Sequence, residues 1–362
     1  MSEVRLANLC KNFGAVTAVD HLDLVVADKE FVTLLGPSGC GKTTTLRMIA
    51  GFTRPDEGEI SVDGRVMVSR ASGVFVPPEK RHMAMVFQNY ALWPHFTVIE
   101  NVMFGLRSRG VAKSKARSKA MDALSLVRLD GMAARYPHQL SGGQQQRVSL
   151  ARAIASEPTV LLMDEPLSNL DAKFRETMRF EIKELHNKMG ITTIYVTHDQ
   201  TEAIAMSDRI CVMWEGRILQ TASPVDIYQR PNCTEVADFI GQVNFLPGSL
   251  IEGPDGKLRV ESKWCCLTPD GIQPDFRPGQ EVVVSIRPEH VRLSKARPAA
   301  DDEANVFSAR ISKRVFLGNF QEYWVDLGDH TLRVQASVTE EFDENDPVTV
   351  RLEPDWMTVI EG

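Results

Sequence analysis

The chain has 362 residues, of which 43% are hydrophobic and 25% are charged. Its length exceeds the size at which one hydrophobic core stops growing, so we expect two domains. The net charge of −7 argues against a surface dominated by nucleic-acid binding. No apolar stretch reaches the roughly 18 to 20 residues that a membrane-spanning helix needs, and no signal-peptide core begins the chain. We therefore expect a cytoplasmic protein whose cysteines are small core residues rather than disulfides.

The first predicted elements are short strands, followed by a helix. Residues 4–26 are β-rich with a turn at 12–14, and the apolar run 31–35 predicts a further strand. A glycine-rich segment comes next and leads into a helix-like stretch at 44–50. The elements expected after it are strands at 59–62 and 83–87 and helices at 97–107 and 114–128.

The glycine-rich segment carries the clearest chemical signal. Residues 36–43 match the phosphate-loop pattern G-x-x-x-x-G-K-[ST] at every fixed position. Its glycines let backbone N–H groups turn around an anion, in front of the positive end of a helix dipole. Lys42 can reach the β- and γ-phosphates, and Thr43 can offer its hydroxyl to Mg²⁺. The predicted nucleotide-binding residues are Gly36, Pro37, Ser38, Gly39, Cys40, Gly41, Lys42, Thr43 and Thr44.

Cys40 lies inside this predicted anion site. A neighbouring lysine and a helix N-terminus are conditions that favour a thiolate. We therefore expect Cys40 to be reactive toward alkylating agents and protected by MgATP. The alternative is an inert small residue that fills a position in the loop.

The following elements predict a parallel sheet. Residues 160–163 form an apolar run that is too short for a helix and suits a strand buried on both faces. An amphipathic helix follows at 174–189, with Gly190 as its C-cap, and a second buried strand at 191–196. Strands and helices that alternate around a phosphate loop indicate an α/β domain.

Helical periodicity ends near residue 240. Many short strands at regular spacing are typical of a small β-barrel or sandwich. We therefore predict one domain at 1–240, with a helical subdomain at about 89–155, and a β-rich domain at 241–362. The strands expected in the second domain are 281–286, 305–315, 321–327, 331–335 and 348–352.

Several further motifs follow the phosphate loop in a distinctive order. They are Gln88 at a strand end, Leu140-Ser141-Gly142-Gly143-Gln144 before a helix, Asp164-Glu165 ending a strand, Ser168-Asn169-Leu170-Asp171, and His198 after a strand. With these motifs in this order, the chain resembles the ATP-binding cassette (ABC) ATPases over roughly residues 1–240. The resemblance implies a mainly parallel core sheet with an N-terminal antiparallel β-subdomain and a helical subdomain, followed by a small OB-like (TOBE-type) domain.

The resemblance assigns roles that suit phosphoryl transfer, which depends on positioning and charge neutralisation. Asp164, with Thr43 and Gln88, is expected to hold Mg²⁺ or its bound waters. Glu165 is then placed to polarise the attacking water as a general base, the alternative being a second carboxylate of the metal site without proton transfer. Gln88 would sense the γ-phosphate, and His198 would bind it and couple it to Glu165. The predicted catalytic residues are Lys42, Gln88, Glu165 and His198.

The resemblance also implies a homodimer that encloses two ATP molecules. The serine-glycine motif would cap the nucleotide bound by the opposite subunit, in a two-fold arrangement. Asn169 stands where the family usually has alanine. Phe13 occupies the position of the aromatic residue that stacks on adenine. The residues expected to contact nucleotide across or beside this interface are Phe13, Gln88, Ser141, Gly142, Gly143, Gln144, Asp164 and Asp171.

A single cassette with a β-rich extension resembles the ATPase subunits of bacterial binding-protein-dependent importers. Residues 285–290, which include Ile286-Arg287-Pro288-Glu289, and the entry segment 239–244 match the maltose, polyamine and iron branch. Such a subunit would lie at the cytoplasmic face of the inner membrane and act with two permease subunits and an external solute-binding protein. The segment 87–96 is the candidate groove for a permease helix, with Trp93 as an anchor and Phe96 either an anchor or a core residue.

The substrate is the least determined feature of the sequence. Residues 317–319 and 322–328 look closer to polyamine, iron and phosphonate importers than to sugar importers. A sugar importer stays as one alternative. A soluble ATPase of nucleic-acid processing, or a small-molecule sensor acting through residues beyond 240, would be alternatives of another class, and no nucleic-acid partner is expected.

Overall fold

The computed structural model describes residues 2–272, 275–295 and 304–361. It divides into two compact units, Met1–Pro224 and Val225–Gly362. This boundary lies nearer the N-terminus than the predicted position at residue 240. Two short helices, α7 (Pro224–Gln229) and α8 (Thr234–Ile240), explain the difference, because the buried Arg287 of the second unit donates hydrogen bonds to carbonyl groups of both helical segments.

A six-stranded sheet forms the centre of the first unit, in the order β11-β10-β3-β9-β8-β7. All neighbouring pairs are parallel except β10 and β11. The α/β fold with a mainly parallel core sheet is therefore confirmed. The bounds of the strands are β3 (Phe31–Leu35), β7 (Met83–Val86), β8 (Val160–Asp164), β9 (Thr192–Thr197), β10 (Arg209–Trp214) and β11 (Arg217–Ala222).

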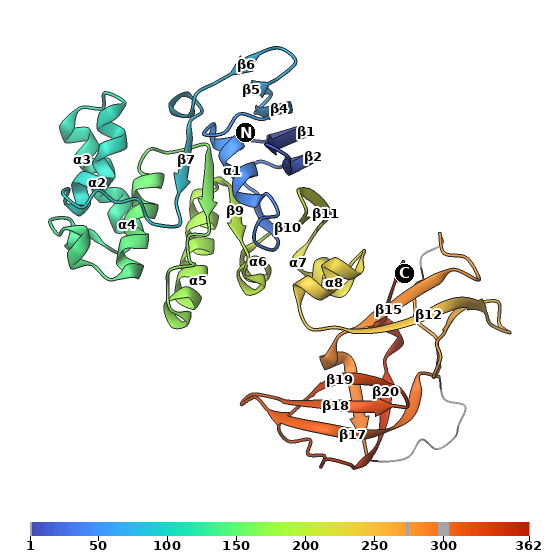
Figure 1. Ribbon diagram of the computed structural model, residues 1–362. Helices are drawn as coiled ribbons and strands as arrows, with labels where there is room; N and C mark the ends of the chain where they lie inside the picture. The colour runs from blue at the N-terminus through green and yellow to red at the C-terminus, as the bar shows by residue number, and fades with distance from the viewer. Residues whose placement is uncertain (1, 273–274, 296–303, 362) are drawn as a thin grey trace. The chain divides into compact units, whose positions relative to one another are not determined.

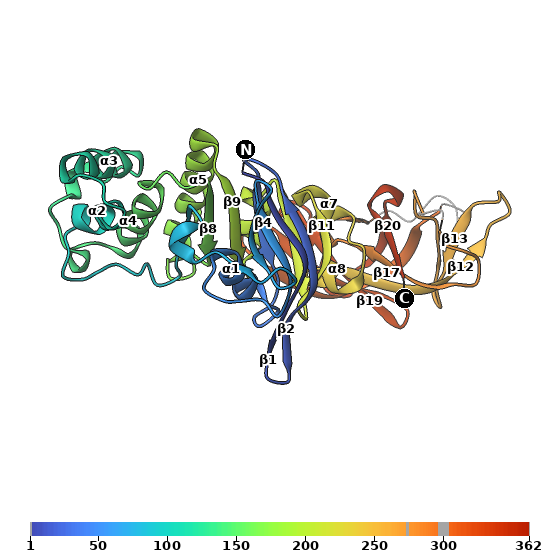
Figure 2. The same ribbon diagram turned by 90° about the horizontal axis from the view of Figure 1, so that it is seen from above.

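Both faces of this sheet are buried, which explains its continuous apolar strands. Successive side chains of β8 alternate between two hydrophobic clusters: Val160 and Leu162 join one, and Leu161 and Met163 join the other. Figure 2 shows the two helices that cover these faces, α1 (Lys42–Ala50) and α5 (Ala172–Met189), on opposite sides of β8 and β9. The left-handed Gly190 ends α5, as predicted.

Two smaller parts complete the first unit (Figure 1). An antiparallel sheet in the order β2-β1-β4-β5-β6 packs over α1, in the same cluster as one face of the core sheet. Helices α2 (Val98–Ser108), α3 (Lys113–Leu126) and α4 (Gly142–Ile154) form a lobe beside β7. The sheet strands are β1 (Val4–Phe13), β2 (Val16–Val26), β4 (Glu57–Val62), β5 (Arg65–Ser69) and β6 (Val74–Phe75).

The second unit carries two five-stranded antiparallel sheets around one hydrophobic cluster. Their orders are β14-β13-β12-β15-β21 and β16-β20-β17-β18-β19. No helix in the described part of the chain is long and apolar enough to cross a membrane. The remaining bounds are α6 (Gln200–Met206), β12 (Asn244–Glu252), β13 (Leu258–Glu261), β14 (Cys266–Leu267), β15 (Glu281–Ile286), β16 (Val291–Ser294), β17 (Val306–Phe316), β18 (Gln321–Leu327), β19 (His330–Ala336), β20 (Pro347–Leu352) and β21 (Thr358–Glu361).

A buried arginine fixes the C-terminal end of α1. The Arg81 side chain is 1% exposed, and its Nη1 donates to the carbonyl oxygens of Met48 and Ile49 at 2.8 and 2.7 Å. Its Nε donates to the carbonyl of Val76 at 2.7 Å. Burial lowers the pKa of Arg81 to about 10. The guanidinium therefore satisfies carbonyl groups that the end of a helix leaves without partners.

We expect Arg81→Met to destabilise the first unit. The change removes the donor to the carbonyl groups of Ile49 and Val76 and one of the two donors to that of Met48. Hydrogen bonds to charged groups contribute about 1.5 to 3 kcal/mol each. We therefore expect an unfolding free energy lower by about 3 kcal/mol, measured as a shift of the first unit's urea midpoint. The exposed Arg65→Met is the matched control, with an expected change within about 0.5 kcal/mol. Equal midpoints for the two variants would contradict the capping role.

Candidate functional site

The predicted phosphate loop connects β3 to α1, the strand-loop-helix context that its pattern requires. Two of its glycines are required by close backbone approaches. A Cβ on Gly36 would lie 2.2 Å from the carbonyl oxygen of Met213, and one on Gly41 would lie 2.2 Å from that of Ala18. Gly41 also has a φ of 100°, in the region that favours glycine. The loop is thus held against β10 and against β2.

The Lys42 ammonium group lies within the loop. Its Nζ donates to the carbonyl oxygens of Gly36 and Pro37 at 2.7 and 2.8 Å, and the side chain is buried. Ser38 and Gly39, at the tip of the loop, are exposed, and Thr43 and Thr44 are half-buried at the start of α1. The positive charge therefore sits at the helix N-terminus, beneath an accessible loop tip.

The expectation of a reactive Cys40 is wrong. Its side chain is 4% exposed, and burial raises the pKa of the thiol despite the Lys42 Nζ 3.7 Å from the sulfur. The sequence argument counted the nearby positive charge and left out the desolvation of the thiolate, which is the larger effect here. The structure supports the alternative, an inert small residue that fills the loop.

Asp164 ends β8 beside the start of α1. Thr43 Oγ1 donates to Asp164 Oδ1 at 2.8 Å. The Asp164 side chain is almost fully buried, and this burial raises the pKa of its carboxyl group. A buried carboxylate and a hydroxyl group at this distance offer oxygen ligands of the kind that hard divalent cations prefer.

Glu165 is the meeting point of three separate segments. Its Oε2 lies 3.1 Å from His198 Nδ1 and 3.5 Å from Gln88 Nε2. These residues follow β8, β9 and β7, whose carboxyl ends lie along one edge of the parallel sheet. Glu165 has a φ of 43°, uncommon for a residue with a side chain. The structure therefore brings together the three residues that were predicted to act on the γ-phosphate.

A buried network below His198 was not predicted. The Glu202 carboxylate is 3% exposed and accepts hydrogen bonds from Tyr195 Oη at 2.8 Å and from Thr197 Oγ1 at 2.7 Å. Thr197 Oγ1 also accepts from the Asp199 backbone N–H at 3.0 Å. Burial raises the pKa of Glu202. Hydrogen bonds thus fix the residues before and after His198. The position of Glu202 in the sequence does not indicate that it is buried, because its hydrogen-bond partners come from the strand before its helix.

Asn169, unusual at its position for the resembled family, contacts the segment after β7. Its Nδ2 donates to the carbonyl oxygen of Gln88 at 2.8 Å. Asp171, two residues on, caps α5 by accepting from the Phe174 N–H at 3.1 Å. The loop at residues 168–171, here called the crossing loop, therefore contacts the backbone of Gln88 through the side chain of Asn169.

The serine-glycine motif lies at the start of α4. Ser141 forms a capping box with Gln144, and Gly142 and Gly143 are the first helical residues. Ser141 and Gly142 are exposed. Within the described ranges, no hydrogen bond or ion pair joins residues 141–144 to the phosphate loop, so one subunit does not bring the two motifs together by such contacts.

Phe13 lies at the end of β1, in the hairpin to β2. Its side chain is 54% exposed, and Lys11 Nζ lies 5.2 Å from the ring centroid. An exposed ring face that carries a cation on one side remains available for stacking. Within the described part of the chain, no hydrogen bond or ring contact ties Phe13 to Gln88, Glu165 or His198.

Comparisons with known proteins agree with this arrangement. Residues 19–168 match the family model "ABC transporter", and residues 284–360 match the model "TOBE domain". The nucleotide loop, the Asp-Glu pair and the serine-glycine motif fall inside the first match. The fold and the site thus define an ABC-type P-loop ATPase.

The relatives narrow this class. The chain is 49% identical over 88% of its length to the spermidine/putrescine import ATP-binding protein PotA of Rubrobacter xylanophilus, covering 82% of that protein. It is 44% identical over 92% of its length to an Fe(3+) ions import ATP-binding protein, FbpC 1, of Rhizobium meliloti, covering 90% of that protein. The chain belongs to the family of ATP-binding subunits of ABC importers, with a C-terminal TOBE domain. It is an ATPase that drives import.

Solved structures match the first unit. The dimeric structure of MJ0796, a bacterial ABC transporter cassette, is 31% identical with a TM-score of 0.54, covering 61% of this chain and 98% of that one. CbiO1 from Clostridium perfringens, part of an ABC transporter complex, is 26% identical with a TM-score of 0.57, covering 62% and 89%. The cassette fold predicted from the sequence is therefore confirmed.

Proposed function

We propose that this ATPase energises the import of a polyamine through a membrane permease. The observation that carries the proposal is the 49% identity to a spermidine/putrescine import ATP-binding protein over most of both chains. A spermidine/putrescine import ATP-binding protein from Marinobacter nauticus is 44% identical over 94% of this chain. The region that favoured polyamine, iron or phosphonate importers over sugar importers lies in the TOBE match.

Mg²⁺ is the metal that we propose for the site. The residues fit it, because the Thr43 hydroxyl and the Asp164 carboxylate lie 2.8 Å apart and the carboxylate is buried with a raised pKa. A divalent cation would favour the ionised carboxylate. Bound with ATP, Mg²⁺ would neutralise phosphate charge. Gln88, predicted as a third ligand, is directed toward Glu165 and would act through water.

We propose that Glu165 is the general base. A carboxylate next to Asp164 can accept a proton from water that attacks the γ-phosphate in line with the leaving oxygen. His198 orients Glu165 through Nδ1, 3.1 Å away. As an imidazolium, with both ring nitrogens protonated, it can also donate to a phosphate oxygen through Nε2. Gln88, which follows β7, donates to the same Glu165 oxygen, Oε2. Lys42 stabilises the negative charge on the β- and γ-phosphates.

Two copies of the chain would complete each nucleotide site. Ser141, Gly142 and Gly143 begin a helix and are not bonded to the phosphate loop of their own subunit, so they are free to bind the nucleotide of a partner. Two structures of the MJ0796 cassette are dimeric, and one of them is bound to ADP and Pi. A two-fold homodimer would enclose two ATP molecules. The crossing loop, which ends at Asp171, would lie at the dimer interface, and Phe13 would stack on adenine.

The proposed permease contact lies on the helical lobe. Trp93 packs on Phe104 with ring centroids 4.1 Å apart, and Phe96 lies 6.0 Å from both rings. The Arg152 guanidinium lies 5.2 Å from the Trp93 ring, and Phe104 is 40% exposed. These aromatic residues form a half-exposed cluster, and two of them, Trp93 and Phe96, follow Gln88 in the same segment of the chain. Such a cluster suits an anchor for a permease helix. A subunit anchored in this way would lie at the cytoplasmic face of the membrane.

We expect Trp93→Ala to weaken association with the permease. Removing a buried interface aromatic can cost about 2 kcal/mol or more, which is about 30-fold in affinity. The measurement is co-purification with the membrane subunits, together with thermal stability and ATP affinity of the isolated chain. Phe180→Ala, at a 67% exposed position on α5, is the control. Normal transport by Trp93→Ala would contradict the anchoring role, and unfolding of the isolated chain would assign Trp93 to the core.

Uptake of labelled polyamine by cells tests the proposed substrate. We expect a strain lacking this gene to lose uptake of labelled spermidine, and the wild-type gene to restore it where Glu165→Gln does not. Retained spermidine uptake in the deletion strain would contradict the proposal. Ferric iron is the second candidate, favoured by the 44% identity to the Fe(3+) import protein. Loss of iron uptake with normal spermidine uptake would establish it.

A further inference from the structure

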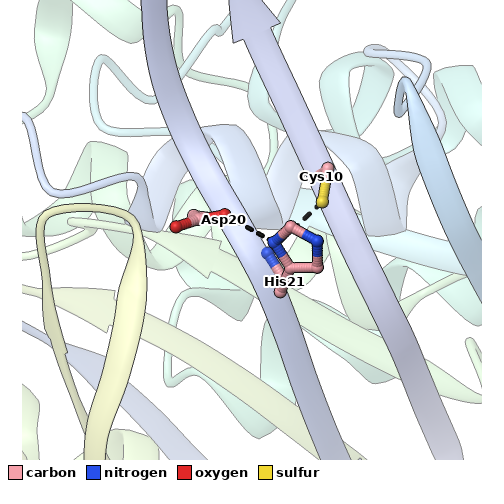
Figure 3. A group of neighbouring side chains, drawn as sticks. All are labelled: Cys10, Asp20 and His21. Atoms are coloured by element: carbon pink, nitrogen blue, oxygen red, sulfur yellow. Dashed lines mark hydrogen bonds and ion pairs between the residues drawn. The ribbon is translucent and has the colours of Figure 1, made fainter.

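A cluster of three potential metal ligands lies on the antiparallel sheet, apart from the nucleotide residues. The Cys10 Sγ, an Asp20 carboxylate oxygen and a His21 ring nitrogen all lie within 4.8 Å of one another. Figure 3 shows the three side chains facing one another from β1 and β2. Cys10 is 5% exposed, whereas the His21 side chain is 65% exposed. The cluster is thus closed on the sulfur side and open to solvent on the imidazole side.

A β-bulge creates the cluster. Leu9 pairs with Leu22 and Lys11 with Val19, so Cys10 alone faces two residues of β2, Asp20 and His21. His21 has a φ of 46°, a conformation uncommon for a residue with a side chain. A bulge turns consecutive side chains to the same side, which a regular strand does not allow. The local backbone therefore brings three ligand types together that would otherwise alternate between faces.

The hydrogen bonds around the cluster suit a metal site. Asp20 Oδ1 faces His21 Nδ1 at 2.6 Å, and its other oxygen, Oδ2, accepts from Arg217 Nε at 2.6 Å. The His21 backbone N–H donates to Cys10 Sγ at 3.3 Å, which stabilises negative charge on sulfur. Arg217 thus orients the carboxylate from behind, as outer partners of metal ligands do.

We propose that Cys10, Asp20 and His21 form a binding site for a thiophilic divalent cation, of which Zn²⁺ fits best. One thiolate, one imidazole and one carboxylate, with water as the fourth ligand, is a donor set typical of zinc. Ligands about 2.0 to 2.3 Å from a tetrahedral metal lie roughly 3.3 to 3.7 Å apart. The Asp20–His21 contact must open by less than about an ångström to reach this spacing. The exposed His21 side chain has room to make that movement.

The site is linked to the phosphate loop through the backbone. The Asp20 N–H donates to the carbonyl oxygen of Gly216 at 3.0 Å, and the Gly216 N–H donates to that of Cys40 at 3.2 Å. The strand that provides Cys10 also carries Phe13 at its end. Metal bound here therefore holds the hairpin and the turn that support the nucleotide loop.

Binding of Co²⁺ to the full-length, tag-free protein tests the proposal, because a Co²⁺–thiolate bond gives a charge-transfer absorption band. We expect one equivalent of Co²⁺ to produce the band without nucleotide, and Zn²⁺ to displace it. Cys10→Ala should abolish the band and weaken Zn²⁺ binding by about 100-fold or more, and Arg217→Met by about 10-fold. Zn²⁺ should also raise the melting temperature of the wild type and not that of Cys10→Ala.

Two controls keep the outcome unambiguous. The double variant Cys265→Ser/Cys266→Ser removes two consecutive cysteines of the second unit. It should leave the band unchanged. The melting temperature of Cys10→Ala without metal shows whether that variant folds, and His21→Gln gives a second test at an exposed position. A band that persists in Cys10→Ala or disappears in the Cys265/Cys266 variant would overturn the proposal, as would no band in the wild type.

Discussion

Glu165→Gln is expected to bind ATP with nearly wild-type affinity and to hydrolyse it about 10² to 10⁴ times more slowly, the usual contribution of a general base. The glutamine keeps the size of the side chain and can still contact His198 and Gln88. It cannot accept the proton of the attacking water. The measurements are ATP affinity and single-turnover hydrolysis in the assembled transporter. The closed, ATP-bound dimer should accumulate.

The control for this variant is Glu184→Gln on α5, where the carboxylate is 71% exposed and lies 3.7 Å from Arg128. We expect it to hydrolyse ATP at the wild-type rate. A Glu165→Gln transporter that keeps wild-type hydrolysis would show that Glu165 is a carboxylate of the metal site without proton transfer. Loss of ATP binding in the same variant would show a structural role instead.

Lys42→Ala should lose nucleotide affinity itself. The ammonium lies in the phosphate loop, and hydrogen bonds to charged groups contribute about 1.5 to 3 kcal/mol, so we expect the dissociation constant for ATP to rise about 10- to 100-fold. Equilibrium titration with a fluorescent ATP analogue measures this. Lys115→Ala, at an exposed position on α3, is the matched control. An unchanged dissociation constant for Lys42→Ala would show that the loop does not hold the phosphates.

The nucleotide loop and the Asp164-Glu165 pair could be identified in the sequence because their information is local. A phosphate loop needs fixed glycines between a strand and a helix, and each of these is visible in consecutive residues. The family resemblance grouped Glu165, Gln88 and His198 around the γ-phosphate, and in the structure each follows a strand of the same sheet. Helix α5 and its cap at Gly190 followed from periodicity and a single glycine.

Features that depend on distant contacts could not be predicted. Arg81 lies in a polar turn, and only the fold shows that it caps α1 from within the core. The sequence indicates a surface position for Glu202 on a short helix. In the structure its carboxylate is buried and accepts hydrogen bonds from Tyr195 and Thr197. The pKa of Cys40 depends on burial that the motif does not reveal. The two compact units divide after Pro224, before the last helical segments, because Arg287, 46 residues from Gly241, bonds to those segments from the second unit.

ATP hydrolysis by the chain reconstituted in proteoliposomes with its permease tests the account most directly. We predict that hydrolysis is slow until a polyamine-loaded binding protein is added outside, rises with it, and is accompanied by accumulation of the polyamine inside. Glu165→Gln should lose both hydrolysis and accumulation, and Trp93→Ala should lose the stimulation. Hydrolysis at the same rate with and without the permease and the loaded binding protein, with no accumulation of solute, would contradict the account.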